Sequence, residues 1–171
     1  MPYTLWHRDE LIGETDFETE NDQSGPRAAE RRHLAGVFRP TTYGRRLLPR
    51  LCGMLTAGFD LKEELARRGL TGDDTSPETI DHLFETTEAG AHIVDIGRVL
   101  SEVELRDPGG VTLKVASMAF IELAELASLA HRLGMDESAY TEHAPPDVPE
   151  FLVSVTLRDL ARYCFRQMPL Q

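Results

Sequence analysis

The chain has 171 residues, of which 41% are hydrophobic and 27% are charged, and its formal net charge is −11. This composition is ordinary for a soluble globular protein, and the length predicts one domain that buries about two-thirds of its unfolded surface. No apolar run approaches the ~20 residues of a transmembrane helix, and the first ten residues lack the basic and apolar regions of a secretory signal. We therefore expect a single cytoplasmic domain over 1–171 that has no contact with a membrane.

Charge and cysteine content argue against a general nucleic-acid-binding protein and against a disulfide-rich or metal-binding one. The acidic balance disfavours a general affinity for nucleic acid, whose phosphates attract basic surfaces. The charge is uneven, since residues 1–26 hold seven acids and one arginine, whereas residues 27–50 hold seven arginines and one glutamate. Cys52 and Cys164 lie far apart among apolar neighbours, so we expect buried thiols and neither a disulfide framework nor a paired metal motif.

Residues 3–17 predict a β-hairpin whose turn falls within "RDE", although no Gly or Asn marks its position. With Asp9 and Glu10 as the turn residues, Trp6 lies opposite Gly13 and covers it. We interpret the carboxylates of this hairpin as groups that keep an edge strand soluble and that face the arginines following in the sequence.

The next segments predict a loop, a strand and a long helix. The polar segment 18–30 contains Gly and Pro and predicts a loop, and 34–38 predicts a short strand. Apolar residues at three- and four-residue spacing predict a helix from Gly44 to the "RRG" at 67–69, bent or divided at Gly58.

A second helix start is marked by Ser76, a good N-cap residue, and by Pro77 at the first helical position. The following segment 91–100 is ambiguous. Its β-branched residues favour a strand, and Gly90 and Gly97 punctuate it.

Residues 102–115 give the clearest prediction, a β-hairpin in which apolar and polar residues alternate on both strands. Pro108, Gly109 and Gly110 suit a three-residue turn. Every apolar residue falls on one face in the following register: Asp107 with Val111, Leu105 with Leu113, and Val103 with Val115.

The last third of the chain predicts an amphipathic helix over 118–134, a Pro-rich loop over 136–150 and a central apolar strand over 151–157. Thr156 is a candidate cap for a closing helix. Strands and helices interleave without βαβ regularity. We therefore expect an α+β fold with a small mixed or antiparallel sheet, whose two β-hairpins pack against three to four helices.

Sequence motifs typical of catalytic, nucleotide-binding and metal sites are absent. The sequence contains no GxxxxGK[ST], GxGxxG, GxSxG, HExxH or CxxC, and its six histidines are scattered. The nearest approach to a metal site is His82 and His92 with the carboxylates around them, which we interpret as a solvated acidic face. We therefore expect no catalytic residue, no metal and no cofactor, and we lean away from an enzyme.

The segment 27–50 is the most unusual local feature, because arginine clusters bind phosphates, nucleic acid or acidic protein patches. The candidate partner-binding residues are Arg31, Arg32, Arg39, Arg45, Arg46 and Arg50. The alternative interpretation is intramolecular. The acidic 1–26 and the basic 27–50 would then neutralise one another in surface pairs that contribute ~0–1 kcal/mol each.

The leading hypothesis is a non-enzymatic protein-interaction module, such as an adaptor, an accessory subunit or an inhibitor or immunity-type protein. It would bind another protein, or a second copy of itself, through charged surface patches. The alternative is a nucleic-acid-related role, either phosphate binding through the arginines of 27–50 or acidic mimicry of DNA. A second alternative, a small-molecule enzyme or sensor, requires a pocket where Trp6, a histidine and two carboxylates converge.

Overall fold

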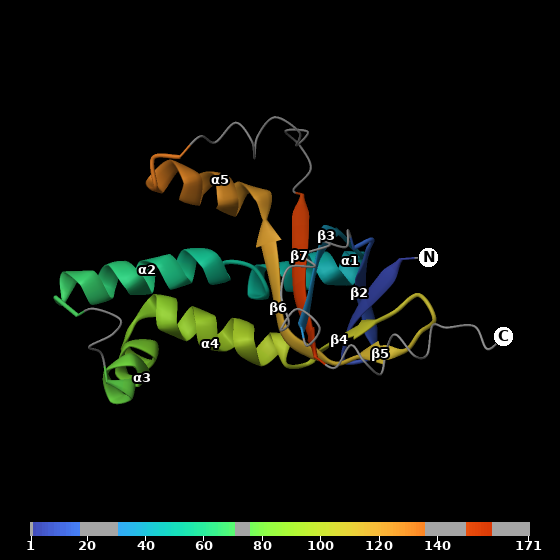
Figure 1. Ribbon diagram of the computed structural model, residues 1–171, viewed down its shortest axis with the longest axis horizontal. Coiled ribbons are helices and arrows are strands. Elements are labelled where there is room, and N and C mark those ends of the chain that lie inside the picture. The colour runs from blue at the N-terminus through green and yellow to red at the C-terminus, as the bar shows by residue number, and fades with distance from the viewer. Residues whose placement is uncertain (1, 18–30, 71–75, 136–149, 159–171) are drawn as a thin grey trace. The chain divides into compact units, whose positions relative to one another are not determined.

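The computed structural model describes residues 2–17, 31–70, 76–135 and 150–158 (Figure 1). The chain divides into two compact units, which we call the barrel unit (1–46, 103–120 and 151–171) and the helical unit (47–102 and 121–150). The single domain expected over the whole chain stays a prediction. The predicted loops at 18–30 and 136–150 lie outside the described residues, apart from Glu150.

The barrel unit is built from one sheet of seven strands in the order β5-β4-β1-β2-β3-β7-β6. The strands are β1 (Tyr3–His7), β2 (Glu10–Thr15), β3 (Arg31–Pro40), β4 (Val103–Arg106), β5 (Thr112–Leu113), β6 (Val115–Glu122) and β7 (Phe151–Arg158). The edge strands β5 and β6 follow one another in the chain with only Lys114 between them. One bent segment therefore forms both edges, and the antiparallel sheet is nearly barrel-shaped. It has more strands than the two predicted hairpins supply.

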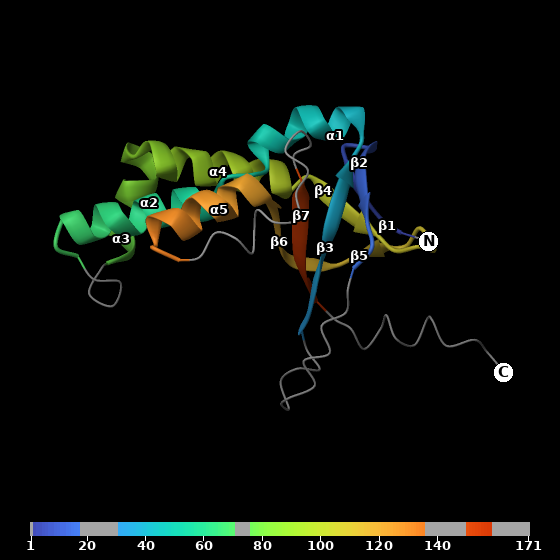
Figure 2. The same ribbon diagram turned by 90° about the horizontal axis from the view of Figure 1, so that it is seen from above.

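Alternating strand residues form the core of the barrel. In β7 every second residue from Phe151 to Leu157 is buried, and the residues between them are half-buried. The ring of Phe120 in β6 meets the ring of Phe38 in β3 edge-on, with 4.9 Å between centroids. Other fully buried side chains of the barrel are Leu5, Ile12, Leu105, Val153 and Val155. The strands β3 and β7 run side by side through this core (Figure 1 and Figure 2).

The first hairpin forms with a register that differs from the prediction. Arg8 and Asp9 join β1 to β2, and both have left-handed backbones with φ of 49° and 66°. Positive φ at both central residues is the mark of a type I′ turn, which usually selects Gly or Asn. A bulge between Leu5 and Trp6 then places Gly13 opposite Leu5. The predicted pairing of Trp6 with Gly13 is therefore wrong. The expected edge position is wrong as well, since β1 and β2 lie inside the sheet between β4 and β3.

The second hairpin has the predicted turn. Leu105 pairs with Leu113, and the Asp107 amide donates to the carbonyl of Val111 at 2.9 Å. The buried carboxylate of Asp107 accepts hydrogen bonds from the amides of Gly109 and Val111 at 2.9 and 2.8 Å. This side chain fixes the turn by satisfying two amides that no strand partner reaches.

The pairing predicted between Val103 and Val115 is wrong. The ladder of β4 with β5 contains two pairs and ends at Leu113. Val103 pairs instead with His7 of β1. The chain bends at Lys114, whose carbonyl accepts a hydrogen bond from the amide of Arg158 at 2.8 Å, and β6 continues beside β7.

The helical unit contains the 3-10 helix η1 (Leu48–Arg50) and the helices α2 (Met54–Arg67), α3 (Pro77–Thr86), α4 (Glu88–Leu100) and α5 (Leu123–Arg132). The short helix α1 (Thr42–Leu47) precedes η1 in the chain. Helix α4 contacts both α2 and α3, and α5 lies along α2 (Figure 1 and Figure 2). The buried apolar residues of α2, α3 and α4 are Ala57, Leu61, Leu83, Ile96 and Val99. Within the described ranges, no helix is long and apolar enough to span a bilayer.

The long helix predicted from Gly44 is divided at a different glycine. Gly53 has φ of 93° and separates η1 from α2. A residue with a side chain is strained in this conformation, so Gly53 ends the first helical run. Gly58, the expected point of division, lies inside α2, where a Cβ would have nothing within 4 Å.

The segment 91–100, for which a strand was favoured, belongs to α4. The helix has its own N-cap, because the Thr87 hydroxyl accepts a hydrogen bond from the Gly90 amide at 3.0 Å. A Cβ on Gly90 would lie 2.5 Å from the Cα of Phe84, so this glycine permits the close approach of α3. Packing against α2 and α3 overrides the β-propensity of the segment. The predicted cap of α3 is confirmed, since the Ser76 hydroxyl accepts from the Thr79 amide at 3.3 Å.

The last predictions are confirmed in part. Residues 115–122, of which the last five were expected to be helical, form β6, and the helix covers only Leu123–Arg132. The central strand predicted over 151–157 is β7, which lies between β3 and β6. Thr156 is inside β7 and is not a helix cap. The rest of the predicted closing helix lies outside the described residues.

Candidate binding cleft of the helical unit

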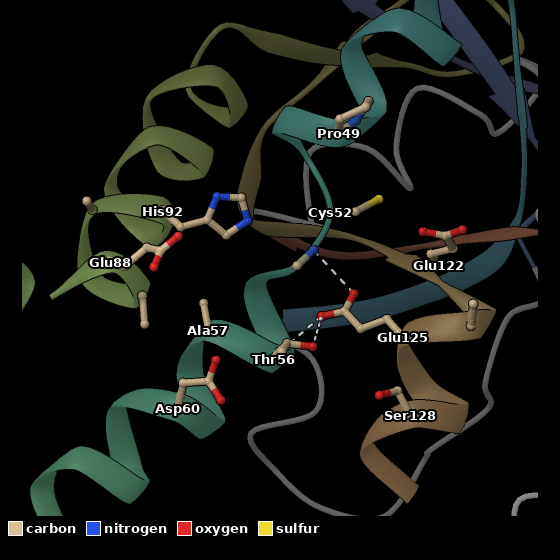
Figure 3. Close-up of a pocket in the computed structure, with 14 residues that line it drawn as sticks. Pro49, Cys52, Thr56, Ala57, Asp60, Glu88, His92, Glu122, Glu125 and Ser128 are labelled. Carbon is tan, nitrogen blue, oxygen red and sulfur yellow. Dashed lines mark hydrogen bonds between the residues drawn. The ribbon is translucent and has the colours of Figure 1, made fainter. Parts of the chain in front are cut away.

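A cleft of about 920 Å³ is lined by residues of α2, α4 and α5 (Figure 3). Its volume is within the range of small-molecule sites, roughly 300–1,000 Å³. The polar side chains that line it are Thr56 and Asp60 of α2, Glu88 and His92 of α4, Glu125 and Ser128 of α5, and Glu122 just before α5. Cys52 and Gly53 lie at the end of the cleft where α2 begins.

The start of α2 depends on a side chain from another helix. Its N-cap residue is Gly53, which has no side chain to accept a hydrogen bond. The carboxylate of Glu125 accepts from the amides of Gly53 and Thr56 at 3.2 and 3.0 Å, and from the Thr56 hydroxyl at 3.0 Å (Figure 3). A carboxylate there also interacts favourably with the positive end of the helix dipole. Glu125 therefore fastens α5 to the beginning of α2.

His92 approaches the same point from α4. A Cβ on Gly53 would lie 2.7 Å from Nε2 of His92, and Figure 3 shows the imidazole directed toward this end of the cleft. The positive φ of Gly53 favours glycine at this position, and a larger residue there would also displace the His92 ring. The junction between η1 and α2 therefore lies where the side chains of His92 and Glu125 approach Gly53.

The thiol of Cys52 is a poor nucleophile. Burial, followed by the negative charges of Glu125 and Glu122, raises the pKa of this free thiol from 9.0 to about 12. The thiolate is the nucleophilic form of cysteine, so the protonated thiol of Cys52 is inert at neutral pH. The expectation of a buried thiol is met in part, because Cys52 is half-buried and lines the cleft, while Cys164 lies outside the described residues.

Alkylation kinetics test the state of Cys52. In a Cys164→Ser background, Cys52 should react with iodoacetamide at pH 8 about ten- to a hundredfold more slowly than an unstructured cysteine peptide. Glu122→Gln should speed the reaction, because it removes a negative charge that raises the thiol pKa. Glu104→Gln, on the exposed surface of β4, is the control and should leave the rate unchanged. Mass spectrometry over time measures all three, and a wild-type rate equal to that of the peptide contradicts the assignment.

The cleft is acidic, with four carboxylates and no lysine or arginine among its lining residues. Two of the four have partners: Glu125 binds the start of α2, and Asp60 accepts a hydrogen bond from Arg132 at 2.9 Å. Glu88 and Glu122 have no hydrogen-bond or ion-pair partner within the described part of the chain. Two uncompensated negative charges therefore face this space.

A smaller cleft of about 270 Å³ shares Asp60 and Glu88 with the first and extends the acidic surface along α2. It is also lined by Glu63, Glu64 and Arg67. Arg67 is paired with Glu64 at 2.7 Å. The two clefts adjoin at Asp60 and Glu88, and we call them together the acidic groove of the helical unit.

The arginines proposed from the sequence do not form one cluster. Arg31 and Arg32 begin β3, and Arg39 lies near its other end. At about 3.3 Å per residue, this separation is roughly 23 Å. Arg45 and Arg46 are exposed in the last turn of α1, with no ion-pair partner among the described residues.

Two of the candidate arginines bind carboxylates within their own unit. Arg39 donates to Asp16 at 2.6 Å, so the acidic hairpin does meet the basic segment at this point. Arg50 of η1 donates to Asp95 of α4 through two nitrogens, at 3.1 and 3.3 Å. Both pairs are largely exposed and contribute little stability. The assignment of the six arginines to partner binding stays a prediction.

The small-molecule alternative requires Trp6, a histidine and two carboxylates in one pocket, and only part of this set lines the cleft. His92 and several carboxylates line the cleft, but Trp6 belongs to the barrel unit. Its indole N–H donates to the Thr4 hydroxyl at 3.0 Å, and the guanidinium of Arg106 lies 4.5 Å from the centre of its ring. Within the residues that the structure describes, no three histidine, cysteine or acidic side chains are placed to hold a metal ion.

Sequence reasoning singled out His92 and its neighbour Glu88, but it missed the contribution of α5. The only local signal for Glu125 is indirect. Gly53 precedes a helix whose first turn contains no acidic residue, so that helix needs an acceptor from elsewhere. Nothing in the sequence says that this acceptor lies 72 positions away.

Comparisons with known proteins found no matching protein-family model, no matching curated protein and no matching solved structure.

Proposed function

We propose that this chain is a non-enzymatic protein-interaction module, and that the acidic groove of its helical unit receives a basic segment of a partner protein. The observation that carries the proposal is the pair of unpartnered carboxylates, Glu88 and Glu122, in a cleft of about 920 Å³ without a lining lysine or arginine. An adaptor, an accessory subunit or an inhibitor would use such a surface.

The chemistry of the groove matches a basic segment better than a neutral one. A carboxylate that loses water without gaining a cation or a donor is destabilised, so an occupant must offer positive charge or hydrogen-bond donors. Arginine offers five donors in a planar fork that fits carboxylates, and lysine offers a compact ammonium. Glu88 and Glu122 line the same cleft from different segments, so an occupant with more than one positive charge suits the pair.

Binding is favoured over catalysis by the state of the lining groups. The thiol of Cys52 is held protonated by its pKa of about 12, which removes the obvious nucleophile. The carboxylate of Glu125 is occupied by the amides at the start of α2. Glu88 is exposed, so its carboxylate is accessible to a positively charged ligand.

The nucleic-acid alternative rests on Arg45 and Arg46, which are exposed and have no ion-pair partner among the described residues. Arg39 and Arg50 already bind carboxylates, which weakens this alternative. The same two arginines are a second candidate contact for an acidic patch on a partner protein.

A labelled basic peptide tests the groove directly. Wild-type protein should bind a fluorescent tetra-arginine peptide, measured by anisotropy, and the affinity should fall from 50 to 300 mM NaCl. The double variant Glu88→Gln/Glu122→Gln should bind about tenfold or more weakly, because charge-assisted hydrogen bonds are lost.

A matched control separates site binding from general attraction to an acidic protein. Asp81→Asn/Glu85→Gln removes the same charge from exposed positions of α3, in the same unit but outside the groove. This control should keep wild-type affinity. An equal loss in both double variants, or no binding by the wild type at 50 mM NaCl, overturns the proposal.

A further inference from the structure

Helix α5 is held on α2 by polar contacts at both of its ends. Near its start, Glu125 accepts hydrogen bonds from the amides of Gly53 and Thr56. At its last residue, Arg132 donates to Asp60 at 2.9 Å and to Glu63 at 3.1 Å. These contacts bracket the ten residues of the helix.

Few side chains of α5 are fully buried. Ala130 is the only fully buried residue of α5, and Leu123, Leu126 and Leu129 are only half-buried. Half-buried leucines gain part of the ~1.5–3 kcal/mol that full burial of such a side chain contributes. The polar contacts at its two ends therefore add a salt-sensitive contribution to the attachment of the helix, beside the contribution of its half-buried leucines.

The position of Arg132 resembles a bound ligand more than a surface ion pair. Its guanidinium lies between the carboxylates of Asp60 and Glu63, and 4.7 Å from the centre of the Phe59 ring. Two carboxylates and an aromatic face are a combination that recognises a guanidinium group. Asp60 lines both clefts of the acidic groove and Glu63 lines the smaller one, so the chain's own arginine binds two carboxylates of that groove.

We propose that α5 is a flap over the acidic groove, latched by Arg132, and that an arginine of a partner's basic segment opens it by displacing Arg132 from Asp60 and Glu63. This inference rests on the proposed function, because Arg132 would compete with an arginine of the partner for the same carboxylates of the groove. The flap turns about the start of α5, where the Leu123 amide donates to the Glu150 carbonyl at 3.0 Å. Release of the latch lets the half-buried leucines of α5 contact the partner.

The latch makes the apparent affinity of the groove lower than its intrinsic affinity. When only a fraction of the protein has the site open, the apparent affinity for a ligand is reduced by that fraction. Removing the internal competitor should therefore strengthen binding of an external arginine. This is the reverse of the usual effect of mutating a residue at a binding site.

Hydrogen exchange of the full chain tests the latch without any ligand. In Arg132→Gln, the amides of 123–132 should exchange about three- to tenfold faster than in the wild type, while those of α3 keep their rate. Arg98→Gln is the matched control, because Arg98 is an exposed arginine paired with Asp95 on α4. It should leave exchange in α5 within about twofold of wild type. Salt at 1 M should bring the wild type toward the rate of Arg132→Gln.

The tetra-arginine peptide tests the competition. It should speed exchange in α5 of the wild type, and it should bind Arg132→Gln about three- to tenfold more tightly than Arg98→Gln, which has the same net charge. Unchanged exchange in Arg132→Gln overturns the latch. Equal peptide affinity in both variants overturns the competition but leaves the proposed function standing. Faster exchange without peptide binding overturns the proposed function and supports the latch alone.

Discussion

Gly44→Ala should unfold or severely destabilise the barrel unit, lowering the free energy of unfolding by about 3 kcal/mol or more. A Cβ on Gly44 would lie 2.8 Å from the carbonyl carbon of Ile12 and closer still to its oxygen. These are backbone atoms of β2, so they cannot move aside as a flexible side chain does. The start of α1 is also tied to β2, because the Thr41 amide donates to the Ile12 carbonyl at 2.9 Å.

Gly58→Ala is the matched control for that substitution. Gly58 lies in the interior of α2, and a Cβ there would have nothing within 4 Å. Alanine is the better helix former by about 1 kcal/mol, so this variant should be more stable than the wild type. Urea denaturation followed by far-UV circular dichroism measures both. A Gly44→Ala protein as stable as Gly58→Ala would contradict the close approach of α1 to β2.

Phe120→Ala should destabilise the barrel unit by about 3–5 kcal/mol, the usual range for a buried phenylalanine. The side chain of Phe120 is 1% exposed and meets Phe38 edge-on. These two rings come from β6 and β3, which lie on either side of β7. Truncation leaves a cavity in the core and removes an aromatic contact worth roughly 0.5–1.5 kcal/mol beyond its buried area.

Val37→Ala, on β3 next to Phe38, provides the comparison. Val37 is 42% exposed, so its truncation should change stability by less than about 1 kcal/mol. Thermal and urea unfolding of the two variants should therefore differ clearly. Similar losses in both would mean that Phe120 does not belong to the barrel core.

Local sequence signals predicted elements whose determinants are close together in the chain. The turn at 108–110 and the cap at Ser76 are both fixed by side chains within a few residues, and both formed as expected. The central position of β7 was also predictable, because five of its eight residues are apolar. The α+β class follows from the same signals.

The remaining features depend on contacts that no local pattern contains. The segment 91–100 is helical because α2 and α3 cover it, in spite of its β-branched residues. The first hairpin places two residues with side chains, Arg8 and Asp9, at positive φ, where sequence rules expect Gly or Asn. The cleft arises where α2, α4 and α5 meet, and the pairing of Glu125 with Gly53 was therefore outside the reach of periodicity.

The place of β7 in the sheet has a consequence for synthesis on the ribosome. This strand is the last one described in the chain, yet it lies between β3 and β6. The chain up to Glu150 therefore leaves one edge of each of those strands without its partner, although α2, α3 and α4 are already complete. Unpaired strand edges attract other chains, so the interval before residues 151–158 emerge is the period of greatest aggregation risk for this protein.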